Sequence, residues 1–137
     1  MRKILFLLLI SHFSFAQKEK IQVTDLTKIK NVVAIASNNE KAIYALKTIE
    51  ATPDKPLEYD YVTNLYLINL QNPQKHIALT RGNEGASQPA LSPDGKTVAF
   101  TRTVKEKSQI FILPLEGGEP WQLTNTKYGA ASPQFSP

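Results

Sequence analysis

The fold of this chain is decided by residues 89–100, PALSPDGKTVAF. Within it, Pro93-Asp94-Gly95 is a turn signal, because proline presets the first turn angle and glycine accepts a positive φ. The turn separates two short β-favouring runs, at 88–91 and 97–101. Two more runs follow, at 108–115 and 121–124. Four short strands within about 44 residues are the size of one propeller blade, so this stretch predicts a β-propeller.

The chain repeats itself around this stretch. Residues 37–43 match residues 92–98 at a spacing of 55, and the strands expected in this earlier copy are 31–36, 42–47, 61–70 and 76–80. The charged, proline-containing residues 51–60 account for the extra length as an enlarged loop. At a spacing of 44, four matches relate residues 79–93 to the C-terminal residues 123–137: Leu79-Thr80 with Leu123-Thr124, Gly85-Ala86 with Gly129-Ala130, Pro89 with Pro133, and Ser92-Pro93 with Ser136-Pro137.

The repeat predicts an all-β fold, a partial β-propeller of four-stranded antiparallel blades. Blade one covers about 31–80, blade two about 88–124, and a third blade starts at 131–137. The alternative is a small β-sandwich with a chance internal similarity. A WD-type propeller is disfavoured, because the Gly-His and Trp-Asp pairs of that repeat are missing from the proper places.

The N-terminus has the three-part plan of a secretory signal peptide. A basic start, Met1-Arg2-Lys3, precedes the apolar run 4–10, and Ser14-Phe15-Ala16 offers a small-x-small cleavage site. Seven apolar residues are too few for a stable membrane span, which needs about 20. We therefore predict a signal peptide at 1–16, a leader segment at 17–30, and export to the periplasm or the extracellular space.

Composition excludes several functions. The chain has 137 residues and no cysteine, which rules out disulfides, Cys-ligated zinc and a thiolate nucleophile. It carries 16 Lys and Arg against 12 Asp and Glu. Because the signal peptide holds two of the basic residues, Arg2 and Lys3, the mature chain is nearly balanced, and its charges are scattered. Nucleic-acid binding usually needs a concentrated basic face, so this partner is not expected.

One stretch carries a family resemblance. Residues 89–100, followed by Gln109-Ile110-Phe111-Ile112, Gly117-Gly118-Glu119 and Gln122-Leu123-Thr124, resemble a complete propeller repeat of the TolB type. That repeat is shared by periplasmic TolB proteins and by the N-terminal propellers of prolyl oligopeptidase-family serine peptidases. Residues 23–30 resemble the leader before the first blade of the acylaminoacyl-peptidase-like members. The first blade departs from the pattern, with Asn38-Asn39-Glu40 in place of Pro-Asp-Gly.

The resemblance implies two alternative functions. In a secreted prolyl oligopeptidase-family peptidase, the propeller restricts access to a C-terminal α/β-hydrolase domain that carries a Ser-Asp-His triad and hydrolyses short peptides. In a TolB-like protein, the propeller binds protein partners in the periplasm without catalysis. The peptidase is favoured, because TolB proteins place a separate α/β domain before the propeller. Only about 14 residues separate Gln17 from Asn31, too few for a domain.

The repeat also predicts that the chain is a fragment. It ends at 134–137, QFSP, where the previous copy continues with Asp-Gly and three more strands. A blade that stops there leaves an unpaired edge, and closed propellers have typically 4–8 blades. The expected partners are therefore the C-terminal hydrolase domain of the same parent chain and a peptide substrate.

No catalytic, cofactor-binding or metal residue is predicted in this chain. The stretch 85–89, GASQP, lacks the last glycine of the Gly-x-Ser-x-Gly elbow that a serine hydrolase needs. His76, the single histidine after the signal peptide, has no partner histidine for a metal, and the acids show no ligand spacing. Residues 58–61, EYDY, are expected to form a solvated loop, and Trp121 is expected to pack within its blade.

Overall fold

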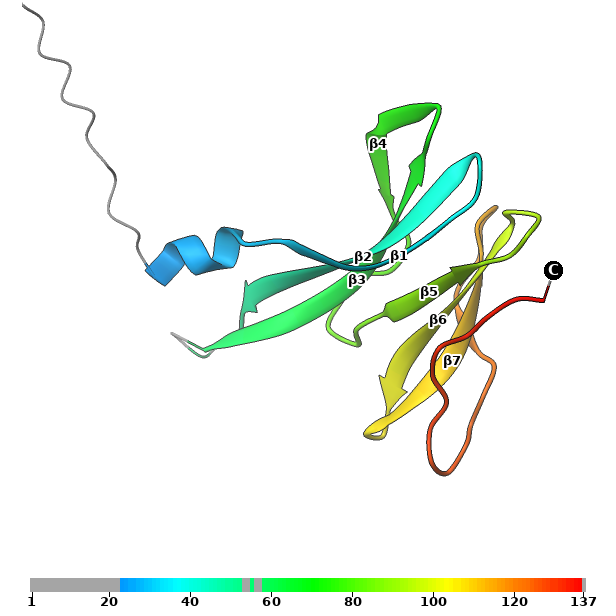
Figure 1. Ribbon diagram of the computed structural model, residues 1–137. Helices are drawn as coiled ribbons and strands as arrows, with labels where there is room; N and C mark the ends of the chain where they lie inside the picture. Colours follow the sequence, from blue (N-terminus) through cyan, green and yellow to red (C-terminus); the bar gives the residue numbers. More distant parts are fainter. Residues whose placement is uncertain (1–22, 53–54, 56–57, 137) are drawn as a thin grey trace, which may run out of the picture.

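The computed structural model describes residues 23–52, 55 and 58–136, without the side chains of Val23 and Leu26. The predicted signal peptide and residues 17–22 of the leader lie outside the described residues. The rest of the leader contains a 3₁₀ helix, η1 (Val23–Lys28), which contacts strand β2 and is closed by an ion pair of 2.6 Å between Lys28 Nζ and Asp25 Oδ1 (Figure 1). No helix in the described part is long and apolar enough to cross a membrane.

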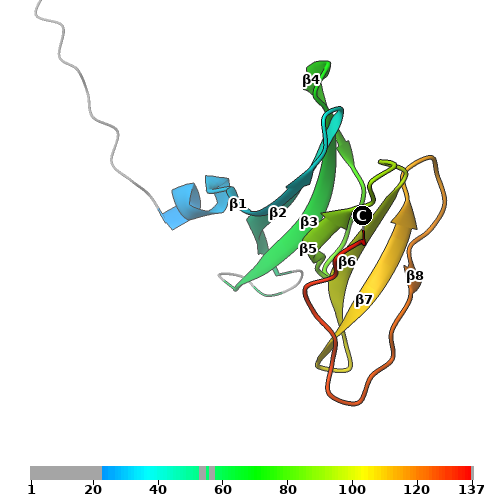
Figure 2. The same cartoon turned by 45° about the vertical axis from the view of Figure 1, so that its right-hand side comes forward.

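In the residues that the structure describes, eight strands form two four-stranded antiparallel sheets, one after the other along the chain (Figures 1 and 2). The sheets have the orders β1-β2-β3-β4 and β5-β6-β7-β8, and β1 contacts β5. The predicted all-β fold, a partial propeller, is therefore confirmed. The strands are β1 (Asn31–Ser37), β2 (Lys41–Ala51), β3 (Tyr59–Asn69), β4 (Asn72–Ala78), β5 (Ser87–Leu91), β6 (Thr97–Val104), β7 (Lys107–Pro114) and β8 (Trp121–Gln122).

The β2–β3 hairpin is longer than predicted. The pairing of the two strands continues through Glu50 with Asp60 to Ala51 with Tyr59. The enlarged loop expected at 51–60 is therefore shorter, and the ends of that stretch belong to the strands. Thr52 N–H donates to the Glu58 carbonyl at 2.9 Å, which extends the hairpin beyond the pair of Ala51 and Tyr59.

The first turn of each blade is built differently. In blade two, Gly95 has a φ of 65°, as the Pro-Asp-Gly signal requires, and the hairpin closes with Ser92 N–H donating to the Thr97 carbonyl. In blade one, the Asn38 side-chain oxygen accepts from the N–H groups of Glu40 and Lys41 at 2.9 and 2.8 Å. None of residues 38–40 has a positive φ, so a side-chain cap replaces the left-handed turn residue.

This difference corrects the predicted spacing of 55 between residues 37–43 and 92–98. The pairs that close the two hairpins are Ser37 with Ala42 and Leu91 with Val98. Structurally equivalent residues therefore lie 54 apart before the turn and 56 apart after it. The sequence comparison indicated a single spacing because the residues of the two turns resemble each other. The blade-one turn is nevertheless two residues shorter.

We expect the turn of blade two to weaken at low pH. Asp94 accepts hydrogen bonds from Ser92 Oγ and Lys96 N–H at 2.5 and 3.1 Å, and the Ser92 bond is the main cause that lowers the pKa of Asp94 below its usual 3.8. A lowered pKa stabilises the fold above the unfolded value, and this stabilisation is lost as the pH falls through the folded pKa. Urea unfolding should show wild type more stable than Asp94→Asn at pH 7, with the gap closing below pH 3.8. A gap that stays constant down to pH 2 would contradict this role.

The hydrophobic core lies between the two sheets. Blade one contributes the side chains of β2 and β3 that face blade two, and blade two contributes those of β6 and β7 that face blade one. At the centre, the rings of Phe100 and Phe111 stack with their centroids 5.9 Å apart. Each sheet therefore buries one face against its neighbour, as repeat folds require. The core residues are Ile43, Ala45, Leu65, Leu67, Ala86, Val98, Phe100, Phe111 and Leu113.

The matched Leu-Thr pairs of the repeat make the same hydrogen bonds in both blades. Thr80 Oγ1 accepts from Leu65 N–H at 2.9 Å and donates to Asn64 Oδ1 at 3.0 Å. Thr124 Oγ1 accepts from Ile110 N–H at 2.9 Å and donates to the Gln109 side chain at 2.9 Å. These threonines hold the chain against the third strand after the fourth strand has ended. We call each arrangement a threonine clamp.

Candidate functional site

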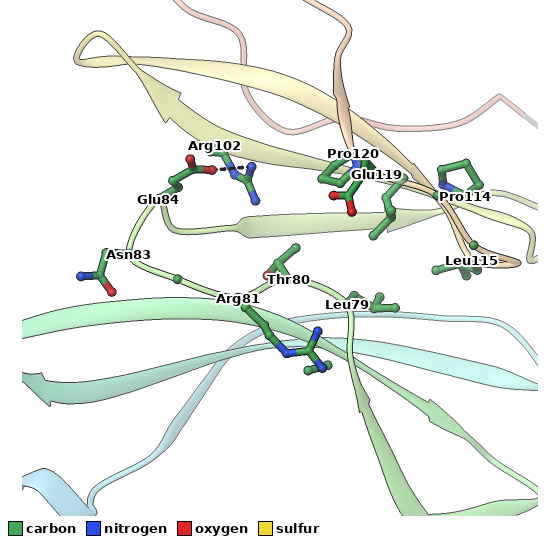
Figure 3. Close-up of a pocket in the computed structure, with 15 residues that line it drawn as sticks. Leu79, Thr80, Arg81, Asn83, Glu84, Arg102, Pro114, Leu115, Glu119 and Pro120 are labelled. Carbon is green, nitrogen blue, oxygen red and sulfur yellow. Dashed lines mark ion pairs between the residues drawn. The ribbon is translucent and has the colours of Figure 1, made fainter.

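A groove of about 650 Å³ lies between the blades (Figure 3). One wall is the loop 79–84 that leaves β4, and the other is the end of β7 with the turn 114–120. The threonine clamp at Thr80 holds the first wall. Gly117 and Gly118, with φ values of 129° and 121°, shape the second wall, since other residues rarely adopt this backbone.

Arg102 is the most constrained charged side chain of the groove. It is 13% exposed, and its Nη1 lies 2.6 Å from Glu84 Oε2. Its Nε donates to the Gly85 carbonyl at 3.3 Å, and its guanidinium lies 5.2 Å from the centroid of the Phe111 ring. Arg102 therefore joins the loop wall to the aromatic core, and two of its nitrogens have partners within the fold.

The remaining charges of the groove are exposed. Arg81 and Glu119 stand on opposite walls, and Figure 3 shows no ion pair between them. The Thr80 hydroxyl is engaged in its clamp, so it cannot act as a nucleophile without breaking the blade. The described residues of the groove therefore do not form a nucleophile with an adjacent base.

Two other residues considered from sequence make contacts within the blades. Ser87 Oγ lies 3.0 Å from Thr101 Oγ1, a strand-to-strand contact without a base. His76 is exposed on β4, and its Nδ1 lies 2.7 Å from the Tyr44 hydroxyl. Across the described ranges, no three His, Cys, Asp or Glu side chains gather as metal ligands would.

Tyr61 and Trp121 are both exposed. The loop expected at 58–61 is wrong for residues 59–61, which belong to β3 and pair with β2. They are nevertheless exposed, and Lys47 Nζ lies 4.3 Å from the ring centroid of Tyr61. Trp121 is 50% exposed on the edge strand β8, and the packing expected for it is only partial in the described residues.

Sequence reasoning missed Arg102 and the polar partners of the two clamps. A lone arginine in a strand carries no signal of its own. The Leu-Thr match at a spacing of 44 was visible, but its role depends on the third strand lying beside it.

Comparisons with known proteins agree with the fold. No protein-family profile matches the sequence. The chain is 28% identical over 123 residues to the uncharacterized peptidase YuxL of Bacillus subtilis, a match that covers 88% of this chain and 18% of YuxL.

Solved structures with the same fold are also peptidases. The Pyrococcus horikoshii acylaminoacyl peptidase matches 74% of this chain with 15% of its own, at a TM-score of 0.58 and 23% identity. The β-propeller domain of the Trilobed protease from Pyrococcus furiosus, described as having an open velcro topology, matches 69% of this chain with 28% of its own, at a TM-score of 0.50 and 24% identity.

The chain thus spans less than a third of the length of each of these proteins. Its sequence likeness is to a peptidase, and its fold is that of the propellers of peptidases. The chain therefore has the fold of part of a β-propeller, as the repeat predicted, and it shares this fold with these peptidase structures.

Proposed function

We propose that this chain is the N-terminal propeller part of an exported serine peptidase of the prolyl oligopeptidase family. The observation that carries the proposal is the match of 88% of the chain to only 18% of a peptidase. A propeller part accounts for the short coverage, and a catalytic domain accounts for much of the remaining length. The signal-peptide pattern at 1–16 supports export.

In this proposal the described residues restrict access to the active site and take no part in catalysis. Two blades packed through the Phe100 and Phe111 core form a rigid unit, with the inner strands β1 and β5 in contact. A ring of such blades in front of an active site excludes folded proteins and admits short peptides. The nucleophile, its histidine and its aspartate come from an α/β-hydrolase domain outside residues 1–137.

The proposal names short peptides as the substrate class. An acylaminoacyl peptidase with this fold was solved in complex with Z-Gly-Gly-Phe-chloromethyl ketone, a peptide-like compound. The peptide-like part of this compound supports short peptides as the substrate class.

The test uses the complete gene product, purified after export. We expect N-terminal sequencing to begin at Gln17, a fluorophosphonate probe to label one serine, and peptide p-nitroanilides to be hydrolysed. Alanine at the serine of the Gly-x-Ser-x-Gly elbow is the matched control and should abolish both labelling and hydrolysis. A complete protein that lacks the elbow and is not labelled would instead support the TolB-like binding module.

A further inference from the structure

The first strands of the two blades lie side by side. β1 and β5 each stand at the end of their sheet and contact each other. Among the described strands, β4 and β8 at the opposite ends of the sheets are not in contact. The two sheets therefore converge at β1 and β5, as blades do around the axis of a propeller, where the central channel lies.

A third stretch of chain continues this arrangement. Residues 131–136 follow the start of β5 at the repeat spacing of 44, and the Ser132 N–H donates to Gln88 Oε1 at 3.0 Å. The three stretches 31–37, 87–91 and 131–136 thus succeed one another around the axis. We call them the inner edge.

The inner edge consists of apolar and uncharged polar residues in all three copies. Its sequences are NVVAIAS at 31–37, SQPAL at 87–91 and ASPQFS at 131–136. Charged residues make up 20% of the chain, and every one of them lies outside these stretches. The property therefore recurs with the repeat, in stretches whose other residues differ.

The turns that follow the first two stretches carry balanced charges. One turn has Glu40 beside Lys41, and the other has Asp94 close to Lys96. Lys41 Nζ also donates to the Gly95 carbonyl at 2.9 Å, which ties the first turn to the second. This end of the inner edge therefore adds no net charge to it.

Val33 is the residue of the inner edge that is least committed to either face of its sheet. The pairing of β1 with β2 shifts between Val32 and Ala34, which leaves Val33 as the extra residue of a bulge. Val32 lines an apolar hollow on the face away from blade two, and Ala34 packs against the core. Val33 does neither and is 51% exposed. Because bulges re-aim side chains, a side chain at position 33 can reach the space beside the edge.

An edge of this composition distinguishes peptides by their charge. A passage lined with charges attracts groups of the opposite sign and repels groups of the same sign. An uncharged lining does neither, and a charged group that leaves bulk water to pass it loses hydration, which costs free energy. A peptide with uncharged side chains avoids this cost.

We propose that the inner edge makes the protein selective for short peptides without charged side chains, with Val33 as a specificity-determining residue. The inference rests on the proposed function and deepens it, since peptides would reach the active site along the propeller axis, past this edge. The observation that carries it is the recurrence of uncharged sequence in three successive stretches.

The test uses the complete gene product and three peptide p-nitroanilides of one length. They differ only in the residue farthest from the scissile bond, which is lysine, glutamine or glutamate. In the wild type we expect kcat/KM to be several-fold higher for the glutamine peptide than for either charged peptide. Val33→Lys should raise the ratio of kcat/KM for the glutamate peptide to that for the lysine peptide on the order of tenfold, and Val33→Glu should lower it as much. Both shifts should shrink in 1 M NaCl, where the screening length is about 3 Å.

Two sets of controls separate charge from shape and position. Gln74→Lys and Gln74→Glu place the same charges on exposed β4, at the other end of the sheet, and should leave the ratio unchanged. Val33→Gln introduces a longer neutral side chain and should also leave the ratio unchanged. Labelling by a fluorophosphonate shows that each variant retains a folded active site.

Equal ratios in Val33→Lys and Val33→Glu would overturn the proposal. Equal shifts in the Gln74 variants would also overturn it, because charge anywhere on the surface would then act. A wild type that prefers either charged peptide would do the same. Fluorophosphonate labelling distinguishes the two levels: an unlabelled complete protein overturns the proposed function, whereas a labelled protein with unchanged ratios overturns this inference alone.

Discussion

Replacing Phe100 by alanine is expected to remove most of the unfolding free energy of residues 17–137. The ring is 0% exposed, stacks on Phe111 and packs against the aliphatic face of blade one. Deleting a buried phenylalanine costs about 3–5 kcal/mol, because the lost burial is joined by a cavity that the neighbours fill only in part. Small domains are stable by about 5–15 kcal/mol, and a unit of two blades lies near the lower end.

The measurement is urea unfolding followed by far-UV circular dichroism. Tyr128→Ala is the control, because Tyr128 is 87% exposed and its loss should change the unfolding free energy by less than about 0.5 kcal/mol. If Phe100→Ala unfolds at the same urea concentration as Tyr128→Ala, the two blades do not share a core.

The second large effect is expected at the threonine clamp of blade one. Thr80→Val keeps the shape of a side chain that is 5% exposed but removes its hydroxyl. The Leu65 N–H then loses its acceptor and Asn64 Oδ1 loses its donor. An unsatisfied buried donor costs about 1–3 kcal/mol, so we expect a loss of about 2 kcal/mol and faster hydrogen exchange of the Leu65 amide.

Two variants control for this effect. Thr80→Ser keeps the hydroxyl and removes one methyl group, which should cost less than about 1 kcal/mol. Thr124→Val tests the equivalent clamp of blade two, which is less buried and whose Gln109 also bonds to Thr126, so its cost should be smaller. A Thr80→Val variant as stable as Thr80→Ser would show that the hydroxyl contributes nothing.

The strands and the blade size could be predicted from the sequence because their signals are local. A turn such as Pro93-Asp94-Gly95 depends on the backbone preferences of its own residues, and alternation marks the strands on either side. The repeat spacing of 44 residues then related positions that have no strong local turn or strand signal, such as the two Leu-Thr pairs. Both pairs make the same hydrogen bonds in the structure.

Other features could not be predicted because they depend on residues distant in sequence. Gln88 and Ser132 lie 44 residues apart and both have a positive φ, of 49° and 53°. Neither residue type predicts this backbone conformation. The Ser132 N–H donates to Gln88 Oε1 at 3.0 Å, so the hydrogen bond joins equivalent positions of the two copies. The role of Arg102 likewise arises only when Glu84 and the Phe111 ring are brought to it.

By itself, the sequence determined that this chain forms four-stranded antiparallel blades of the propeller type, since turn chemistry, alternation and repeat spacing act over a few residues. It also determined that residues 1–137 contain no Gly-x-Ser-x-Gly elbow. Only the tertiary structure decided which face of each sheet is buried, how the Arg102 groove is formed, and that β1 and β5 lie side by side at the inner edge. These features depend on packing between blades, and a linear pattern does not encode which sheet lies beside which face.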